Sequence, residues 1–242
     1  EEAEVSLRKA LELEPSHPGA LSELGKILAR AGSHGEAIEF FRRLVRLDPG
    51  NGEAWYWLGM SLSLSGEGEE ALEAFEKTLK RDPGHGPAWY NKGCILNSLG
   101  RLEEAGAAFD HAPSIDPENT QAWNNKGGTL LGLGRSGEAA DAFRHVVATD
   151  PGPGPAWYNL GLAEMELGNH APAAEAFEKA LDIDPSLADA WYQKGLSHER
   201  LGQQDEAVAS FDRAIALSPE DGASWFRRGV ALASLGKGAD AI

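Results

Sequence analysis

Residues 86–100 read Gly-Pro-Ala-Trp-Tyr-Asn-Lys-Gly-Cys-Ile-Leu-Asn-Ser-Leu-Gly, and this stretch decides the fold because its landmarks recur along the whole chain. Six of the seven tryptophans are spaced by 34 residues: Trp55, Trp89, Trp123, Trp157, Trp191 and Trp225. The same interval separates phenylalanines from Phe41 to Phe211, prolines from Pro15 to Pro219, and two glycine series, Gly25 to Gly229 and Gly32 to Gly236. Five series in one phase exclude coincidence and define an internal repeat.

Each repeat is predicted to form two helices. With Gly52 as position 1, Trp stands at position 4, Gly at 8 and 15, Ala at 20, Phe at 24 and Pro at 32. Apolar residues with i, i+3, i+4, i+7 spacing predict a first helix over 52–64, which Gly66 ends. Residues 69–81 predict a second helix, which Asp82-Pro83 ends. We expect Gly at position 8 to let the paired helices approach closely. We expect Trp at position 4 to be buried.

These residues resemble the tetratricopeptide repeat, with its Trp-x2-Leu-Gly, Ala-x3-Phe and Pro landmarks, and the wording of residues 88–93 is similar to prokaryotic, notably archaeal-type, arrays. The resemblance implies an all-α fold, a right-handed superhelical α-solenoid of antiparallel helix pairs with a 34-residue period. We expect a single array over 1–242: a half repeat (1–17), full repeats (18–51, 52–85, 86–119, 120–153, 154–187 and 188–221) and a partial repeat (222–242). Because both ends cut through a repeat, we expect a piece of a longer protein; the alternative is a short natural protein with frayed ends.

Two features of the sequence depart from the repeat pattern, and each leads to a structural prediction. The residue at position 7, Leu in the repeat, is basic in four units, where we expect the stem to lie over apolar surface with its charge in water: Lys92, Lys126, Lys194 and Arg228. Pro113 falls inside a predicted second helix, where it removes a hydrogen bond, and it predicts a kink or an early end near Ala112.

Composition excludes several classes of function. Lys plus Arg number 22 and Asp plus Glu 38, giving a net charge of −16, so the chain should repel nucleic acid and anionic membrane. The single cysteine, Cys94, excludes a disulfide framework and favours a reducing, cytoplasmic location. Nucleophile–base pairs, metal-ligand spacings and phosphate-binding loops are not recognisable, and we expect a protein that is not an enzyme and has neither cofactor nor metal.

The resemblance implies that the first helices line a concave groove through positions 2, 5, 6, 9, 12 and 13. Tyr, Trp and Asn dominate positions 5 and 6; Tyr and Trp supply apolar area with a polar handle, and Asn can pair with both backbone groups of a peptide. The predicted partner-binding residues are Tyr56, Trp57, Tyr90, Asn91, Asn124, Asn125, Tyr158, Asn159, Tyr192, Gln193, Phe226 and Arg227. The alternative is structural, since such residues are common in this repeat whatever the ligand.

Charge in the groove is nearly balanced. The lining positions carry five acids (Glu23, Glu53, Glu166, Asp189 and Glu199) and four bases (Lys26, Arg30, Arg200 and Arg227), a net charge of −1. The lysines of the family's carboxylate clamp are not present at positions 2 and 5. We therefore expect a non-catalytic scaffold that binds a peptide or protein partner through neutral groups. The alternatives are a targeting arm of a larger enzyme, such as a glycosyltransferase, and a module that self-assembles through its uncapped ends.

Overall fold

The computed structural model describes residues 2–236, with the side chains of residues 112–115 left outside that description. All regular secondary structure in this range is α-helical. The helices are α1 (Glu2–Leu13), α2 (Pro18–Arg30), α3 (His34–Leu47), α4 (Gly52–Leu64), α5 (Gly68–Arg81), α6 (Gly86–Ser98), α7 (Leu102–Ile115), α8 (Thr120–Gly132), α9 (Ser136–Thr149), α10 (Gly154–Glu166), α11 (His170–Ile183), α12 (Ala188–Arg200), α13 (Gln204–Leu217) and α14 (Gly222–Ser234).

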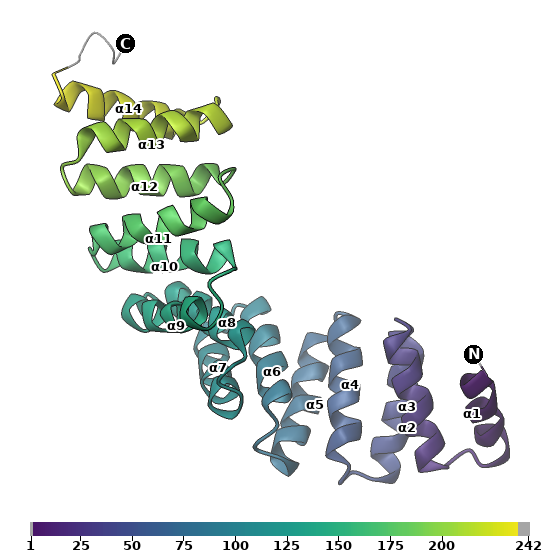
Figure 1. The fold of residues 1–242 in the computed structure, drawn as a ribbon. Coiled ribbons are helices and arrows are strands. Elements are labelled where there is room, and N and C mark those ends of the chain that lie inside the picture. Colours follow the sequence, from purple (N-terminus) through teal and green to yellow (C-terminus); the bar gives the residue numbers. More distant parts are fainter. Residues whose placement is uncertain (1, 237–242) are drawn as a thin grey trace. The chain divides into compact units, whose positions relative to one another are not determined.

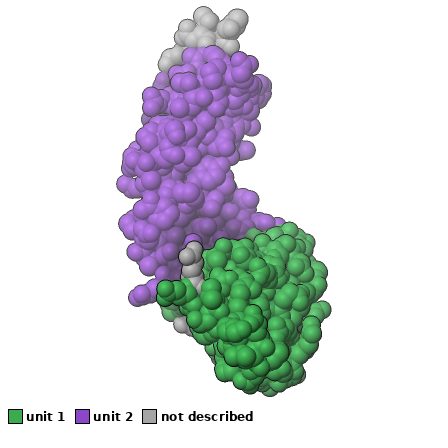
Figure 2. All heavy atoms as spheres, turned by 90° about the vertical axis from the view of Figure 1, so that its right-hand side faces the viewer, with its two compact units in different colours: residues 1–117 green, residues 118–242 purple. Residues whose placement is uncertain are grey.

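The helices alternate between two kinds along the chain (Figure 1). The even-numbered helices occupy positions 1–13 and are called first helices here; the odd-numbered helices end at position 30 and are called second helices. The chain forms two compact units, residues 1–117 and 118–242, which Figure 2 colours separately. Within each unit every helix packs against the next. The predicted all-α solenoid of helix pairs with a 34-residue period is confirmed.

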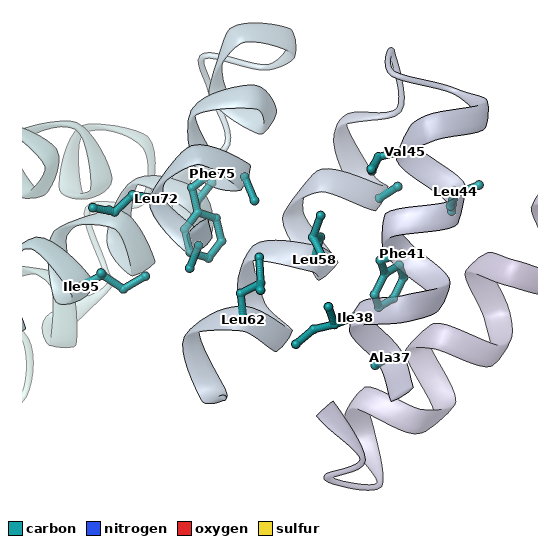
Figure 3. Packing of buried hydrophobic residues seen from close by; sticks show 14 of the residues in the cluster. Ala37, Ile38, Phe41, Leu44, Val45, Leu58, Leu62, Leu72, Phe75 and Ile95 are labelled. Carbon is teal, nitrogen blue, oxygen red and sulfur yellow. The ribbon is translucent and has the colours of Figure 1, made fainter. Parts of the chain in front are cut away.

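The core of each helix pair is a phenylalanine pressed against a glycine. Six Phe at position 24 are fully buried: Phe41, Phe75, Phe109, Phe143, Phe177 and Phe211. Figure 3 shows Phe41 and Phe75 with the aliphatic side chains around them. A Cβ added at Gly93 would lie 2.7 Å from Cε1 of Phe109, closer than two carbons can approach. The expected close approach at position 8 is confirmed, and its physical partner is the Phe ring.

Glycine at position 15 makes the turn between the two helices of a pair. Gly66 has φ of +83°, and its counterparts lie between +70° and +82°. This left-handed conformation costs little for Gly because it has no Cβ. The amide of Glu67 then donates to the carbonyl of Leu62, which ties the turn to the end of α4.

Tryptophan at position 4 is only half-buried, so the expectation of burial is wrong for this series. The ring lies at the edge of the stack, where Nε1 of Trp55 donates to the carbonyl of Pro49 at 3.1 Å; the same bond recurs at Trp89, Trp157, Trp191 and Trp225. Trp225 is 50% exposed. The indole needs an external polar partner for its N–H, which holds it at the loop rather than in the core.

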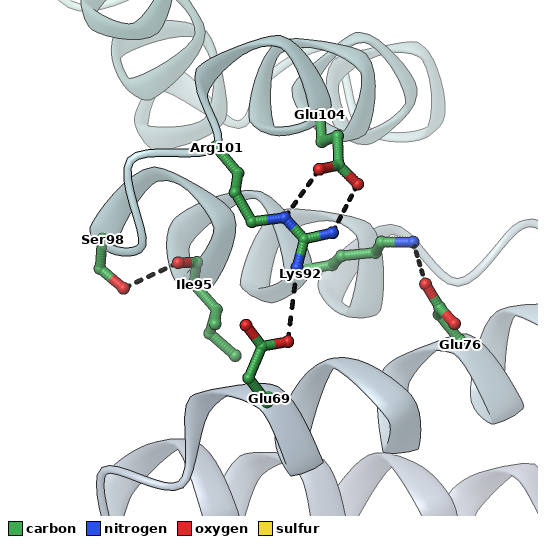
Figure 4. Close-up of polar contacts among 7 residues, drawn as sticks. All are labelled: Glu69, Glu76, Lys92, Ile95, Ser98, Arg101 and Glu104. Atoms are coloured by element: carbon green, nitrogen blue, oxygen red, sulfur yellow. Dashed lines mark hydrogen bonds and ion pairs between the residues drawn. The ribbon is translucent and has the colours of Figure 1, made fainter.

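The basic side chains at position 7 cover these tryptophans. Lys92 Nζ lies 5.7 Å from the centre of the Trp89 ring and 2.9 Å from Glu76 of the preceding second helix (Figure 4). Lys194 repeats the arrangement with Trp191 and Glu178. The expectation that these stems lie over apolar surface is confirmed, and the charge pairs with an acid rather than standing in water alone.

Helix α7 runs to Ile115, so the early end expected near Ala112 is wrong. It has the same 14-residue length as the other complete second helices, which indicates that packing on α6 maintains the helix past Pro113. The kink expected at the same place involves residues 112–115, whose side chains lie outside the described part of the chain, and stays a prediction. None of the described helices combines the length and the apolar character that crossing a membrane requires.

Candidate functional site

First helices line the inner side of each unit. In residues 2–117, α2 contacts α4 and α4 contacts α6; in 118–236, α8 contacts α10, α10 contacts α12 and α12 contacts α14. Consecutive second helices make no such contact anywhere in the described chain. Because only the closer-spaced side of a curved stack can touch across a repeat, the first helices lie on the inner side of each unit. We call the twelve predicted residues at positions 5 and 6 of these helices the binding row.

In the first unit the structure brings Tyr56, Trp57 and Asn91 together. The Tyr56 and Trp57 rings meet edge to face with centroids 6.0 Å apart, and the side chain of Asn91 on the next first helix lies near the Tyr56 hydroxyl. Burial raises the pKa of Tyr56, and the polar Asn91 side chain partly offsets this. The Asn91 amide nitrogen also donates to the carbonyl of Pro87 at 2.8 Å. Asn91 is therefore held in a fixed orientation by its own protein.

Trp57 packs against the preceding repeat. Its ring lies stacked at 6.4 Å from Phe41, and the Arg30 guanidinium lies 5.6 Å from its centre. Glu53, one turn earlier on α4, pairs with Lys26 at 2.7 Å. That lysine bond holds the pKa of Glu53 below its usual value and raises the pKa of Lys26. Trp57 is thus a half-buried anchor with part of its ring left exposed.

The Tyr at position 5 is part of the core packing. Each Tyr ring lies tilted against the Phe at position 24 of its own repeat, with centroids 5.7–6.2 Å apart: Tyr56 on Phe75, Tyr90 on Phe109, Tyr158 on Phe177 and Tyr192 on Phe211. This contact fits the alternative stated for the sequence, in which these residues serve the packing of the repeat whatever the ligand. It leaves each Tyr half-buried, so these rings are rigid and only partly available to a partner.

The second unit holds the other eight residues of the row. Asn124, Asn125, Tyr158, Asn159, Tyr192 and Gln193 are half-buried, while Phe226 is 65% exposed. Arg227 pairs with Glu199 at 3.2 Å, so two of the groove charges counted from the sequence neutralise each other. The structure places these eight on α8, α10, α12 and α14, two to a helix.

A pocket of about 400 Å³ in the second unit was missed by the sequence analysis. It joins the row at Tyr158, and its other lining residues are Pro155, Ser186, Leu187, Ala188, Asp189, Ala190 and Ser218. Asp189 had been counted as a groove acid but not singled out. The sequence signal was at position 34, where His17, Asn51, His85 and Asn119 cap the next helix and Leu187 does not.

Metal-ligating side chains are scattered over the described residues. No three His, Cys, Asp or Glu side chains among them gather in a way that would hold a metal ion. Cys94 is a half-buried cysteine on α6. What the inner side presents is fixed aromatic rings, amides and a pocket, an arrangement suited to holding a ligand.

Comparison with known proteins agrees with this geometry. The profile of the tetratricopeptide repeat matches residues 1–52, 43–84, 58–120, 111–154, 126–188 and 192–242. No curated protein matches the chain. Among solved structures, YrrB, described as a TPR protein with an unusual peptide-binding site, superposes with a TM-score of 0.72 at 22% identity, covering 76% of this chain and 95% of YrrB.

Two further solved structures have the same fold. MamA gives a TM-score of 0.64 at 27% identity over 67% of this chain and 95% of MamA. PilF from Pseudomonas aeruginosa gives 0.64 at 18% identity over 86% of this chain and 94% of PilF. With the repeat profile matched over nearly the whole length and the helix pairs packed as described, the chain belongs to the tetratricopeptide repeat family.

Proposed function

We propose that this chain is a non-catalytic interaction scaffold that binds an extended peptide or a protein partner on the inner side of its first helices. The fold is one typical of protein–protein interaction, and YrrB, which resembles it in fold, is described as having a peptide-binding site. The observation that carries the proposal is the binding row itself: half-buried Tyr, Trp and Asn side chains held in place before any ligand arrives. Preorganised aromatic and amide groups bind with little loss of side-chain entropy.

The row matches the chemistry of a peptide. Ring faces at Trp57 and Tyr90 offer apolar area, and amides such as Asn159 can donate to a carbonyl and accept from an N–H of the same backbone. Several groove charges are already paired within the protein, including Lys26 with Glu53 and Arg227 with Glu199. Affinity along most of the row therefore comes from uncharged contacts. The presence of a single cysteine, Cys94, fits a cytoplasmic setting, which is part of the proposal.

The test is a peptide-display selection on the chain, followed by affinity measurement of the selected peptide for variants in each unit. Trp57→Ala and Asn159→Ala should each weaken binding, while Glu175→Gln, an exposed change on second helix α11, should not. Far-UV circular dichroism checks that each variant stays helical. Unchanged affinity in both Trp57→Ala and Asn159→Ala would remove the binding row as the site.

Self-association is the second candidate, and exposed apolar side chains favour it. Phe226 is 65% exposed and Trp225 is 50% exposed on α14, and Leu13 is 78% exposed on α1. Large exposed apolar groups mark association surfaces. Sedimentation velocity over a hundredfold range of concentration tests this candidate: a single monomer boundary at every concentration excludes it, and a boundary that moves faster as concentration rises supports it.

A further inference from the structure

The pocket beside Tyr158 is large enough to hold a side chain of a bound peptide. Its volume of about 400 Å³ lies in the range of about 300–1,000 Å³ that ligand pockets occupy. Pro155 and Tyr158 line it from α10, Ala188 to Ala190 line it from the start of α12, and Leu187 lines it from the loop between α11 and α12. The walls are therefore mostly apolar, with the Tyr158 hydroxyl and the Asp189 carboxylate as the main polar groups.

The corresponding place in the first unit is filled by the protein itself. There His85, at position 34, lies with its ring 4.6 Å from Tyr56, and its Nδ1 accepts a hydrogen bond from the amide of Ala88 at 3.1 Å. Leu187 at the same position has no ring to stack on Tyr158 and makes no side-chain cap for α12. The His85 ring thus occupies the place beside Tyr56, whereas a pocket lies open beside Tyr158.

The charge of the pocket also differs from that of the first unit. Glu53, at position 2, pairs with Lys26 at position 9 of the preceding repeat at 2.7 Å. Asp189 stands at the same position 2, but position 9 of its preceding repeat is Leu162. No ion pair joins Asp189 within the part of the chain that the structure describes, and no basic residue lines the pocket. The nearby Asp184 accepts hydrogen bonds from both the amide and the hydroxyl of Ser186.

We propose that this pocket binds a basic side chain, with lysine as its simplest form, carried by the peptide that the proposed function places on the binding row. The aliphatic stem lies against Pro155 and Leu187, and the ammonium lies between the Asp189 carboxylate and the Tyr158 hydroxyl. In this way a ligand supplies the cation that Lys26 supplies to Glu53 in the first unit.

The surroundings favour a cation over an anion. Burial raises the pKa of the Tyr158 hydroxyl and the negative charge of Asp189 raises it further, so at neutral pH the hydroxyl keeps its proton and its oxygen can accept from an ammonium. Asp189 lies in the first turn of α12, at the rim of the pocket that its side chain helps to line. A ligand carboxylate placed here would be repelled by Asp189.

The test uses the full chain labelled with ¹⁵N and a small probe, Nα-acetyl-lysine N-methylamide, titrated to millimolar concentration. Shifts should saturate and should map to the amides of the pocket-lining residues. The norleucine analogue, which lacks only the ammonium, should bind about fivefold more weakly, the effect of one partly exposed ion pair. The glutamate analogue should be weaker still.

Two variants complete the experiment. Asp189→Asn should abolish the preference for lysine over norleucine, whereas Glu175→Gln, the same change of charge on the outer helix α11, should preserve it. Equal binding of the lysine and norleucine probes to the wild type, or shifts that map elsewhere, would overturn the inference. The probe needs no peptide partner, so its failure to distinguish lysine from norleucine would leave the proposed function standing. The proposed function is tested separately, by the affinity of the selected peptide for Trp57→Ala and Asn159→Ala.

Discussion

Two neighbouring glycines in α8 should respond in opposite directions to the same substitution. A Cβ at Gly127 would lie 2.7 Å from Cζ and 2.8 Å from Cε1 of Phe143, whereas a Cβ at Gly128 meets nothing within 4 Å. Both lie inside Thr120–Gly132, so both gain the same helix-forming advantage of Ala over Gly, about 0.5–1 kcal/mol. The difference between the two variants therefore isolates the packing of Phe143.

The magnitude follows from the cost of overpacking a dense core, about 1–3 kcal/mol per displaced contact of this kind. Phe143 is fully buried, so a methyl group at Gly127 forces its ring to shift against the surrounding core or to leave its rotamer. We expect Gly127→Ala to lower the free energy of unfolding by about 1 kcal/mol net, and Gly128→Ala to raise it by about 0.5–1 kcal/mol.

Urea denaturation followed by far-UV circular dichroism at neutral pH measures both values. Adding Phe143→Leu to Gly127→Ala provides a check, because the smaller side chain frees space for the new methyl group and should reduce the penalty of the alanine. If the two single variants change stability equally, the close approach of Phe143 to Gly127 does not govern packing and the reasoning fails.

Three further predictions concern stability. Glu164, buried at a position that is Leu in most repeats and paired with Arg144, should be replaceable: Glu164→Leu should leave urea stability unchanged or raise it by about 1 kcal/mol, whereas Arg144→Ala, which leaves the buried carboxylate without its cation, should lower it. Gly66→Ala, at φ +83°, should lower the thermal midpoint because a left-handed residue other than Gly costs about 1–2 kcal/mol; an unchanged midpoint would contradict the strain. Asp221→Ala should speed amide hydrogen exchange in α14 by removing a cap worth about 0.5–2 kcal/mol. The Ser224 hydroxyl lowers the pKa of Asp221 from 3.8, so this effect should be complete above pH 4 and fade as the pH falls through the lowered value; an effect independent of pH would refute it.

The repeat itself was open to prediction because its landmarks are local. Glycine at position 15 and the helix-ending Asp-Pro pairs act within a few residues of themselves, so the helix ends could be placed closely. The burial of Trp at position 4 could not be judged from spacing. Its ring lies on the apolar side of the helix, but its N–H bonds a loop carbonyl six residues earlier, and only the folded loop determines that exposure.

The candidate site also has a part that the sequence predicts and a part that it does not. The residues of the binding row follow from helical phase, since positions 5 and 6 lie on one side of every first helix. The sequence does not tell which of these side chains the protein itself holds in place, because the stacking of Trp57 on Phe41 and the bond between Arg227 and Glu199 join different repeats.

By itself, the sequence determined that this chain is a stack of helix pairs, because each period-34 landmark has one local role that the same residue repeats in every unit. The tertiary structure alone decided which repeats leave open space at the surface. A pocket lies beside Tyr158, whereas the His85 ring stacks on Tyr56 in the first unit, and Leu162 stands where the first unit has the Lys26 that pairs with Glu53. The lining residues of the pocket extend from Pro155 to Ser218 in the sequence, and only packing one helix pair on the next brings them to a single surface.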